Sequence, residues 1–166
     1  DFENGGRLDY ICQRLLGKVD LVDDVEAFTE NEQLGLDALD DAITPEWLHE
    51  QLSSRPGPMK AALMDQSLMA GIGNVYSDEI LFQAGLHPET ASNRLSEADV
   101  AYLRRTMRRV LRTTARHQAD VEQFPRGYLT RHREKGGKCP KCKHNLEVHK
   151  VSGRTAYFCS NCQKKR

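Results

Sequence analysis

Four of the five cysteines fall in the last 28 residues, as two C-x-x-C pairs. Cys139 and Cys142 form the first pair, Cys159 and Cys162 form the second, and sixteen residues separate the pairs. Each pair can present two thiolates from a tight turn, and four thiolates are the ligand set of a tetrahedral structural zinc. Iron in the same four-thiolate cage is the alternative. Since sulfur would fill every position, none stays open for a catalytic water, and we predict one zinc ion with a structural role.

The residues between the two pairs predict a β-hairpin. Residues 146–151 and 155–158 have the composition of two strands, with Ser152 and Gly153 at the turn. A module this short buries too little core to fold alone, so the metal would supply its folding energy. Arg154 follows the turn at an exposed tip. It could bind a phosphate there or simply be a solvated turn residue, and the sequence leaves both open.

A second stretch, residues 64–87, contains a glycine-broken turn between two helical segments. Gly71 and Gly73 precede Asn74, where a helix opens. Glycine permits positive φ and close approach to the main chain. A helix N-terminus carries unpaired N–H groups and a partial positive charge, so it suits a phosphate. We interpret the stretch as a clamp for a phosphate backbone, the alternative being an ordinary helical corner with a glycine cap.

The formal net charge of zero hides an asymmetry between the two ends of the chain. Residues 1–50 contain three basic and fourteen acidic residues, whereas residues 103–166 contain eighteen basic and four acidic ones. Such asymmetry favours a nucleic-acid partner for the basic half over two solvated faces that compensate each other. No run of about 18 apolar residues is present, so we expect no membrane partner. Clustered cysteine pairs and an odd cysteine count indicate an intracellular protein.

Several helices and two short strands are predicted along the chain. Thr44, followed by Pro45, begins a helix whose Trp47 we expect in the core, and short helices are expected near residues 24–29 and 59–65. Residues 74–85 form the next helix, and Ser96 caps the longest one, which ends near residue 116 and carries six arginines. A basic solvated face and direct DNA contact are both open for these arginines. Residues 5–22 suggest two strands at a sheet edge, with Cys12 as a small buried apolar residue.

Taken together, the two motifs resemble one protein family. DQSLMAGIGNVYSDEILFQAGLHP resembles the helix–two-turn–helix signature of formamidopyrimidine-DNA glycosylases and endonuclease VIII-like enzymes, and CPKC…GRTAYFCSNCQ resembles their C-terminal zinc finger. The match covers about residues 45–166. Residues 1–44 are similar to the last strand region of the family's N-terminal domain and its connector.

The resemblance implies a mainly α fold: a helix–two-turn–helix bundle followed by a zinc-bound β-hairpin, with a short β remnant at the N-terminus. We expect residues 1–43 to be that remnant and linker, residues 44–130 the helical DNA-binding domain, and residues 131–166 the four-cysteine zinc finger. The partner implied is damaged double-stranded DNA, bound by a monomer in the cytoplasm, nucleoid or nucleus. Five residues would contact the DNA: Lys60 near the damaged nucleotide, Asn74 and Arg154 on the phosphate beside it, and the backbone of Gly71 and Gly73.

In this family an N-terminal proline amine attacks the sugar, forms a Schiff base and nicks the strand, with a glutamate handling protons. Residue 1 here is Asp, residue 2 is Phe, and Glu3 is in no matching context. We therefore expect the DNA-binding C-terminal part of a base-excision-repair glycosylase/AP lyase, with the upstream segment removed and no catalytic residue in this chain. The alternative is a non-catalytic DNA- or RNA-binding protein that reuses the clamp and finger.

Three departures from the family pattern leave the lesion open. The segment that is typically DPRRFG is DFENGG here, and the stretch before the finger is HREKGGKC in place of YGRxGxPC. Residues 123–128 form a shorter loop than the family's lesion-capping loop. These differences do not support 8-oxoguanine as the substrate.

Overall fold

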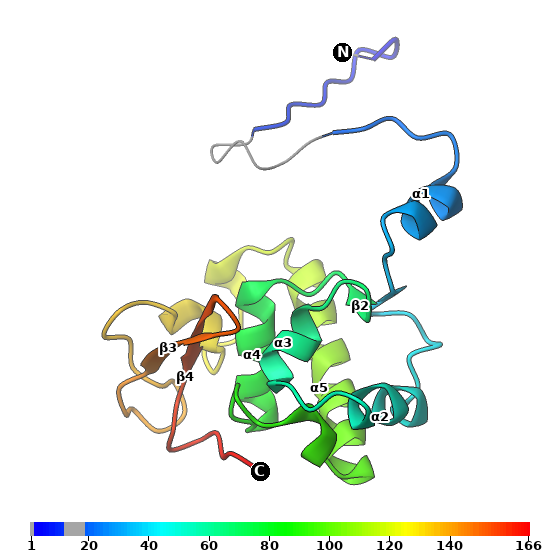
Figure 1. Cartoon of the computed structure of the whole chain (residues 1–166). Coiled ribbons are helices and arrows are strands. Elements are labelled where there is room, and N and C mark those ends of the chain that lie inside the picture. The colour runs from blue at the N-terminus through cyan, green and yellow to red at the C-terminus, as the bar shows by residue number, and fades with distance from the viewer. Residues whose placement is uncertain (1, 12–18) are drawn as a thin grey trace. The chain divides into compact units, whose positions relative to one another are not determined.

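The computed structural model describes residues 2–11 and 19–166, and the chain divides into two compact units, residues 1–32 and residues 33–166 (Figure 1). The one helix described in the first unit is α1, Val25–Asn31. The helix begins directly after Asp24, whose side chain caps it by accepting hydrogen bonds from the backbone N–H groups of Glu26 and Ala27. The short helix predicted near residues 24–29 is therefore confirmed.

The strands predicted in residues 5–22 are wrong for the part that the structure describes. Residues 6–11 and 19–22 have no strand assignment, and Cys12 lies outside the described residues. The apolar residues that suggested alternation are exposed, Leu8 at 68% and Leu21 at 99%. A strand needs a partner for its backbone groups, and an alternating sequence does not supply one.

The second unit is built on four α-helices (Figure 1). They are α2 (Pro45–Ser53), α3 (Met59–Met64), α4 (Asn74–Ala84) and α5 (Glu97–Arg116). Three 3-10 turns, Ser92–Arg94, Val121–Gln123 and Leu129–His132, connect or follow them. Their shared core includes Leu48, Leu63, Ile80, Leu103 and Met107, and Trp47 packs half-buried against it. Helices α4 and α5 lie against each other, and α2 packs on α5.

The helix boundaries follow from their end residues. Thr44 accepts a hydrogen bond from the Trp47 backbone and Pro45 opens α2. Ser96 and Asp99 form a reciprocal capping box at the start of α5. Gly85 ends α4 in the left-handed region with φ +69°. All three boundaries confirm the sequence prediction.

Two small sheets complete the second unit. Strands β1 (Leu36–Asp37) and β2 (Met69–Ala70) pair in parallel, and β3 (Glu147–Val151) and β4 (Arg154–Phe158) form an antiparallel hairpin. The hairpin turn at Ser152 and Gly153 has φ of +47° and +77°, which suits the twist of the flanking strands. The hairpin was predicted, whereas the β1–β2 pair was not. No helix within residues 2–11 and 19–166 has the length and apolar character needed to cross a membrane.

Candidate functional site

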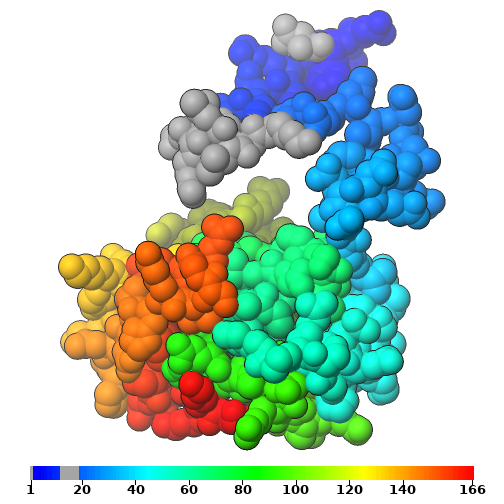
Figure 2. Space-filling view, in the orientation of Figure 1, coloured from blue at the N-terminus to red at the C-terminus, as the bar shows by residue number. Residues whose placement is uncertain are grey.

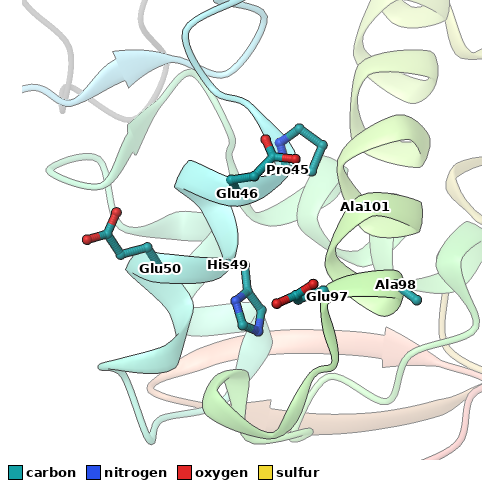
Figure 3. A pocket seen from close by; sticks show the side chains of 7 residues that line it. All are labelled: Pro45, Glu46, His49, Glu50, Glu97, Ala98 and Ala101. Carbon is teal, nitrogen blue, oxygen red and sulfur yellow. The ribbon is translucent and has the colours of Figure 1, made fainter.

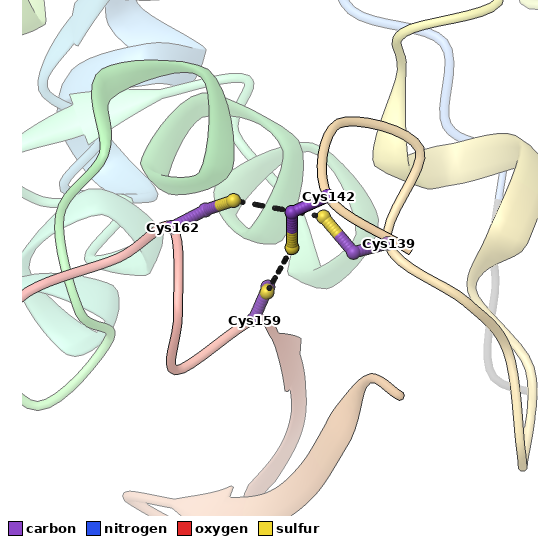
Figure 4. A group of neighbouring side chains, drawn as sticks. All are labelled: Cys139, Cys142, Cys159 and Cys162. Atoms are coloured by element: carbon purple, nitrogen blue, oxygen red, sulfur yellow. Dashed lines mark hydrogen bonds between the residues drawn. The ribbon is translucent and has the colours of Figure 1, made fainter. Parts of the chain in front are cut away.

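The four paired cysteines converge at one point of the second unit (Figure 4). Their sulfur atoms all lie within 4.8 Å of one another, with Cys139 Sγ 3.8 Å from Cys162 Sγ and Cys142 Sγ 3.5 Å from Cys159 Sγ. Four sulfurs placed about 2.3 Å from a central zinc would be about 3.8 Å apart, so the spacing fits a tetrahedral ion. The donor set is therefore suited to a thiophilic metal, and its closed geometry suits a structural role.

Each C-x-x-C pair lies in a tight turn, as predicted. The Cys139 carbonyl accepts a hydrogen bond from Lys143 N, and the Cys159 carbonyl accepts from Cys162 N and Gln163 N. The His144 N–H lowers the pKa of Cys142 to about 5, whereas burial raises the pKa of Cys159 and Cys162. Four thiolates in one small space need a cation to be deprotonated together.

The cysteine cluster is packed against α4. Phe82 of α4 and Leu129 share a buried cluster with Cys139 and Cys159. Gln163 joins the two parts, because its side chain accepts from Cys159 N at 2.9 Å and donates to the Leu86 carbonyl at 2.8 Å. The cysteine cluster is thus a supporting element for the helix that begins at Asn74.

The turn before α4 exposes an uncapped helix N-terminus. Gly71 has φ +98°, which favours glycine, but Gly73 has φ −99°, so the expectation of positive φ holds for Gly71 alone. Gly73 is the N-cap of α4 and no side chain caps the helix there. A Cβ atom added at Gly73 would meet no atom within 4 Å. Asn74 Oδ1 is buried without a hydrogen-bond partner among the described residues.

Lys60 does not reach the surface. Its side chain is fully buried, and its ammonium donates to Asp78 Oδ1 at 2.6 Å, Ser77 Oγ at 3.0 Å and the Asn74 carbonyl at 3.2 Å. Burial lowers the pKa of Lys60, and the Asp78 charge opposes this shift. The lysine thus contacts the backbone of Asn74 from inside the protein.

Asp78 connects the start of α4 to the hairpin. Besides Lys60, its carboxylate accepts from Arg133 Nε at 2.9 Å and from Tyr157 N of β4 at 3.1 Å. The Arg133 guanidinium also lies over the Tyr157 ring, 4.6 Å from its centroid. Sequence reasoning missed Asp78. The available signal was the polar triplet of residues 77–79 inside an otherwise apolar helix, since buried charges need partners.

Arg154 is the first residue of β4, is exposed, and pairs with Val151 across the hairpin. It has no acidic partner in the described part of the chain. The orange surface of the hairpin adjoins the green surface of the α3–β2–α4 segment on one face of the second unit (Figure 2). The structure therefore brings Arg154 and the Gly73–Asn74 helix start onto elements that Asp78 ties together.

A pocket of about 410 Å³ between α2 and α5 differs from this surface in its charge (Figure 3). His49 and three glutamates, Glu46, Glu50 and Glu97, line it. A carboxylate-lined pocket repels phosphate, so we separate it from the surface described above.

Three comparisons identify the chain's relatives. Residues 34–125 match the family model described as "Formamidopyrimidine-DNA glycosylase H2TH domain". The formamidopyrimidine-DNA glycosylase of Chloroflexus aggregans is 35% identical, covering 98% of this chain and 63% of the relative. A Streptococcus pyogenes formamidopyrimidine-DNA glycosylase is 33% identical, covering 100% of this chain and 65% of the relative. The chain thus spans somewhat less than two thirds of the length of these relatives.

Solved structures of proteins from the same family also align with this chain. A Lactococcus lactis Fpg bound to abasic-site DNA aligns with a TM-score of 0.72 at 26% identity, over 85% of this chain and 55% of that one. The MutM (Fpg) protein of Thermus thermophilus aligns with a TM-score of 0.68 at 33% identity, over 81% of this chain and 55% of that one. The match of the family model to more than half of the chain shows that this protein belongs to the formamidopyrimidine-DNA glycosylase family.

Proposed function

We propose that this chain is the damaged-DNA-binding part of a base-excision-repair DNA glycosylase/AP lyase. In this proposal α3, the turn at β2 and α4 make up the helix–two-turn–helix, and residues 131–166 form a zinc finger with one structural zinc ion. Residues 44–130 are the helical DNA-binding domain, and residues 1–43 lead into it. Family membership and relatives solved with abasic-site DNA support the proposal.

The observation that carries it is the uncapped start of α4. Helix N-terminal N–H groups and the partial charge of an 11-residue helix lie open at Gly73, where no side chain caps the helix. These groups are what a phosphate needs from a protein. Because Gly73 has no side chain and no neighbour at its Cβ position, a phosphate oxygen can approach the backbone.

Arg154 supplies the second contact of the proposed clamp, from the hairpin. Its guanidinium is exposed and can form paired hydrogen bonds with a phosphate. Lys60, expected near the damaged nucleotide, acts in this proposal through its hydrogen bond to the Asn74 carbonyl, which fixes the helix start. Gly71 contributes by its positive φ, which turns the chain into Gly73.

The test is the affinity of Asn74→Ala and Arg154→Ala for a duplex with one abasic site, measured by fluorescence anisotropy over a range of salt. Both variants should bind more weakly, and Arg154→Ala should reduce the log–log salt slope by roughly one unit, since one phosphate contact is lost. Arg126→Ala is the matched control, because Arg126 is also exposed and lies outside the proposed clamp. Unchanged affinity in both clamp variants would contradict the proposal.

The second candidate is a non-catalytic DNA- or RNA-binding protein with the same clamp. Such a protein would make the same phosphate contacts from Gly73 and Arg154 without the family's Schiff-base chemistry. Borohydride trapping on abasic DNA should give no covalent adduct with these 166 residues. An adduct would show that this chain carries catalytic chemistry in addition to DNA binding. Tighter binding to a structured RNA than to abasic duplex would favour the second candidate.

A further inference from the structure

Helix α5 carries a row of four exposed arginines, Arg105, Arg109, Arg112 and Arg116. Their spacing of four, three and four residues places them along one side of the helix. At a rise of 1.5 Å per residue the row is about 16 Å long. The buried residues Leu103, Met107, Val110 and Thr114 precede these arginines by two positions. A rotation of about 200° separates the two stripes, so the arginine row faces away from the protein core.

The row lies along a groove of about 620 Å³ beside the start of α2. Two further arginines of α5 that line this groove donate to backbone carbonyls of the segment before α2. Arg108 donates at 2.8 Å to the carbonyls of both Leu39 and Asp40, and Arg104 donates to the Ile43 carbonyl. Of the six arginines that line the groove, two are thus held by backbone carbonyls and four face solvent.

None of the four row arginines has an acidic partner in the part of the chain that the structure describes. Like charges three and four residues apart on a helix repel one another. Arg105 is oriented by the Tyr102 ring, 5.2 Å from its guanidinium carbon, which leaves its hydrogen-bond donors free. A row of mutually repelling cations along a groove is stabilised when an anionic chain binds to it.

The chemistry of the row favours nucleic acid over an acidic protein. All four cations are arginines, whose planar forks match phosphate oxygens in pairs. Their regular, straight spacing suits the repeating charge of a phosphate backbone. A protein partner would need an apolar anchor, whereas the groove offers only Pro45 and Ala101 as fully apolar side chains. The acidic pocket with Glu46 and Glu97 adjoins these two residues and limits the site to the stretch from Arg105 onward.

We propose that Arg105, Arg109, Arg112 and Arg116 form a second nucleic-acid surface, which binds a phosphodiester backbone outside the Gly73–Asn74 clamp. The inference rests on the proposed function only for the class of partner. The two surfaces differ in role: the clamp recognises the backbone at a lesion, and the row binds undamaged DNA without regard to sequence. Such a surface would hold the protein on DNA during a search.

The test uses the full chain and a labelled undamaged duplex about three helical turns long, with binding measured by fluorescence anisotropy over a range of salt. The double variant Arg109→Gln, Arg112→Gln should reduce the log–log salt slope by roughly 1.8, at about 0.9 per phosphate contact. Arg94→Gln, Arg126→Gln is the matched control, since both residues are exposed arginines off the row and the change in net charge is the same. The control should keep the wild-type slope. Equal slope losses in both double variants would overturn the inference.

Two further measurements separate this inference from other outcomes. Gln has a helix propensity close to that of Arg, so circular dichroism should report an intact helix, and Arg109→Lys, Arg112→Lys should restore the slope.

The affinity ratio between abasic and undamaged duplex should persist in the row variant and fall in Asn74→Ala. If Asn74→Ala and Arg154→Ala bind DNA like the wild type while the row variant does not, the proposed clamp is contradicted and the proposed arginine row is supported. Displacement of DNA by poly-glutamate as effectively as by competitor DNA would reassign the row to an acidic protein.

Discussion

Lys60 and Asp78 form an ion pair inside the second unit, with Nζ 2.6 Å from Oδ1 and side chains 0% and 1% exposed. The lysine comes from α3 and the aspartate from α4, eighteen residues later. The second carboxylate oxygen binds the Arg133 side chain and the Tyr157 backbone, both in the part of the chain that holds the four clustered cysteines. One buried carboxylate thus joins the two helices around the glycine turn to the hairpin that carries Arg154.

Breaking this pair should destabilise the protein, and the two partners should differ. Asp78→Ala leaves Lys60 and Arg133 without their shared anion, so we expect a loss of about 3–5 kcal/mol in the free energy of unfolding. Lys60→Met leaves Asp78 with Arg133, and the loss should be smaller. Urea unfolding measures both, with the exposed Lys135→Met as control. A larger loss for Lys60→Met than for Asp78→Ala would contradict the role of Asp78 as the shared partner.

The stability contributed by Asp65 should depend on pH. Hydrogen bonds from Ser67, together with the Arg55 charge, lower the pKa of Asp65 from the ordinary 3.8. Because the folded pKa is depressed, the contribution is present above pH 3.8 and is lost as the pH falls through the folded pKa. At neutral pH, Asp65→Asn should cost about 1 kcal/mol, as expected for weakened hydrogen bonds at a half-exposed site. The free energies of unfolding of Asp65→Asn and the wild type, measured by urea unfolding, should converge at acid pH. A difference that persists there would contradict this prediction.

Removal of zinc should unfold the finger and spare the helical core. Leu48, Ile80 and Leu103 belong to a core that contains none of the four cysteines, whereas Leu146 and Leu129 pack directly with Cys139 and Cys159. Treatment with a chelator should therefore retain most of the far-UV helical signal while amide resonances of residues 139–163 lose dispersion. Released zinc, measured with a colorimetric dye, should be one ion per chain. Collapse of the helical signal together with the finger would show that α4 needs the metal to fold.

Local signals allowed most of the second unit to be predicted. The ends of α2, α4 and α5 are set by Thr44, Gly85 and the Ser96 capping box, which act on their own backbone neighbours. The hairpin boundaries follow from the turn at Gly153 and agree to within one residue. The N-terminal strands failed because pairing is non-local: alternation around Leu8 is present, but no strand lies beside it in the described residues.

The site was less predictable than the fold. Spacing alone identified Cys139 and its three partners, since two C-x-x-C pairs carry their geometry in the sequence. The burial of Lys60 could not be seen, because a lysine eighteen residues from an aspartate has no helical or strand relation to it. For the same reason, the contact of Asp78 with the Tyr157 backbone, seventy-nine residues away, could not be predicted from the sequence.

The last prediction concerns Gly73, where stability and DNA binding should change in opposite directions. An aspartate at this N-cap position can accept hydrogen bonds from the free N–H groups of α4, and its charge suits the helix dipole. Since φ is −99° and no atom lies within 4 Å of the Cβ position, the side chain fits without strain. Gly73→Asp should therefore leave the free energy of unfolding unchanged or raise it by a few tenths of a kcal/mol.

The same carboxylate would occupy the N–H groups that we assign to the DNA phosphate and would repel it. Affinity for abasic duplex should fall at least about tenfold, which corresponds to 1.4 kcal/mol. Gly73→Ser, which adds a cap without charge, should give a smaller loss. Gly71→Ala is the comparison for strain, because its φ of +98° should cost about 1–2 kcal/mol of stability. If Gly73→Asp folds as expected and still binds abasic DNA like the wild type, the start of α4 is not where the phosphate binds.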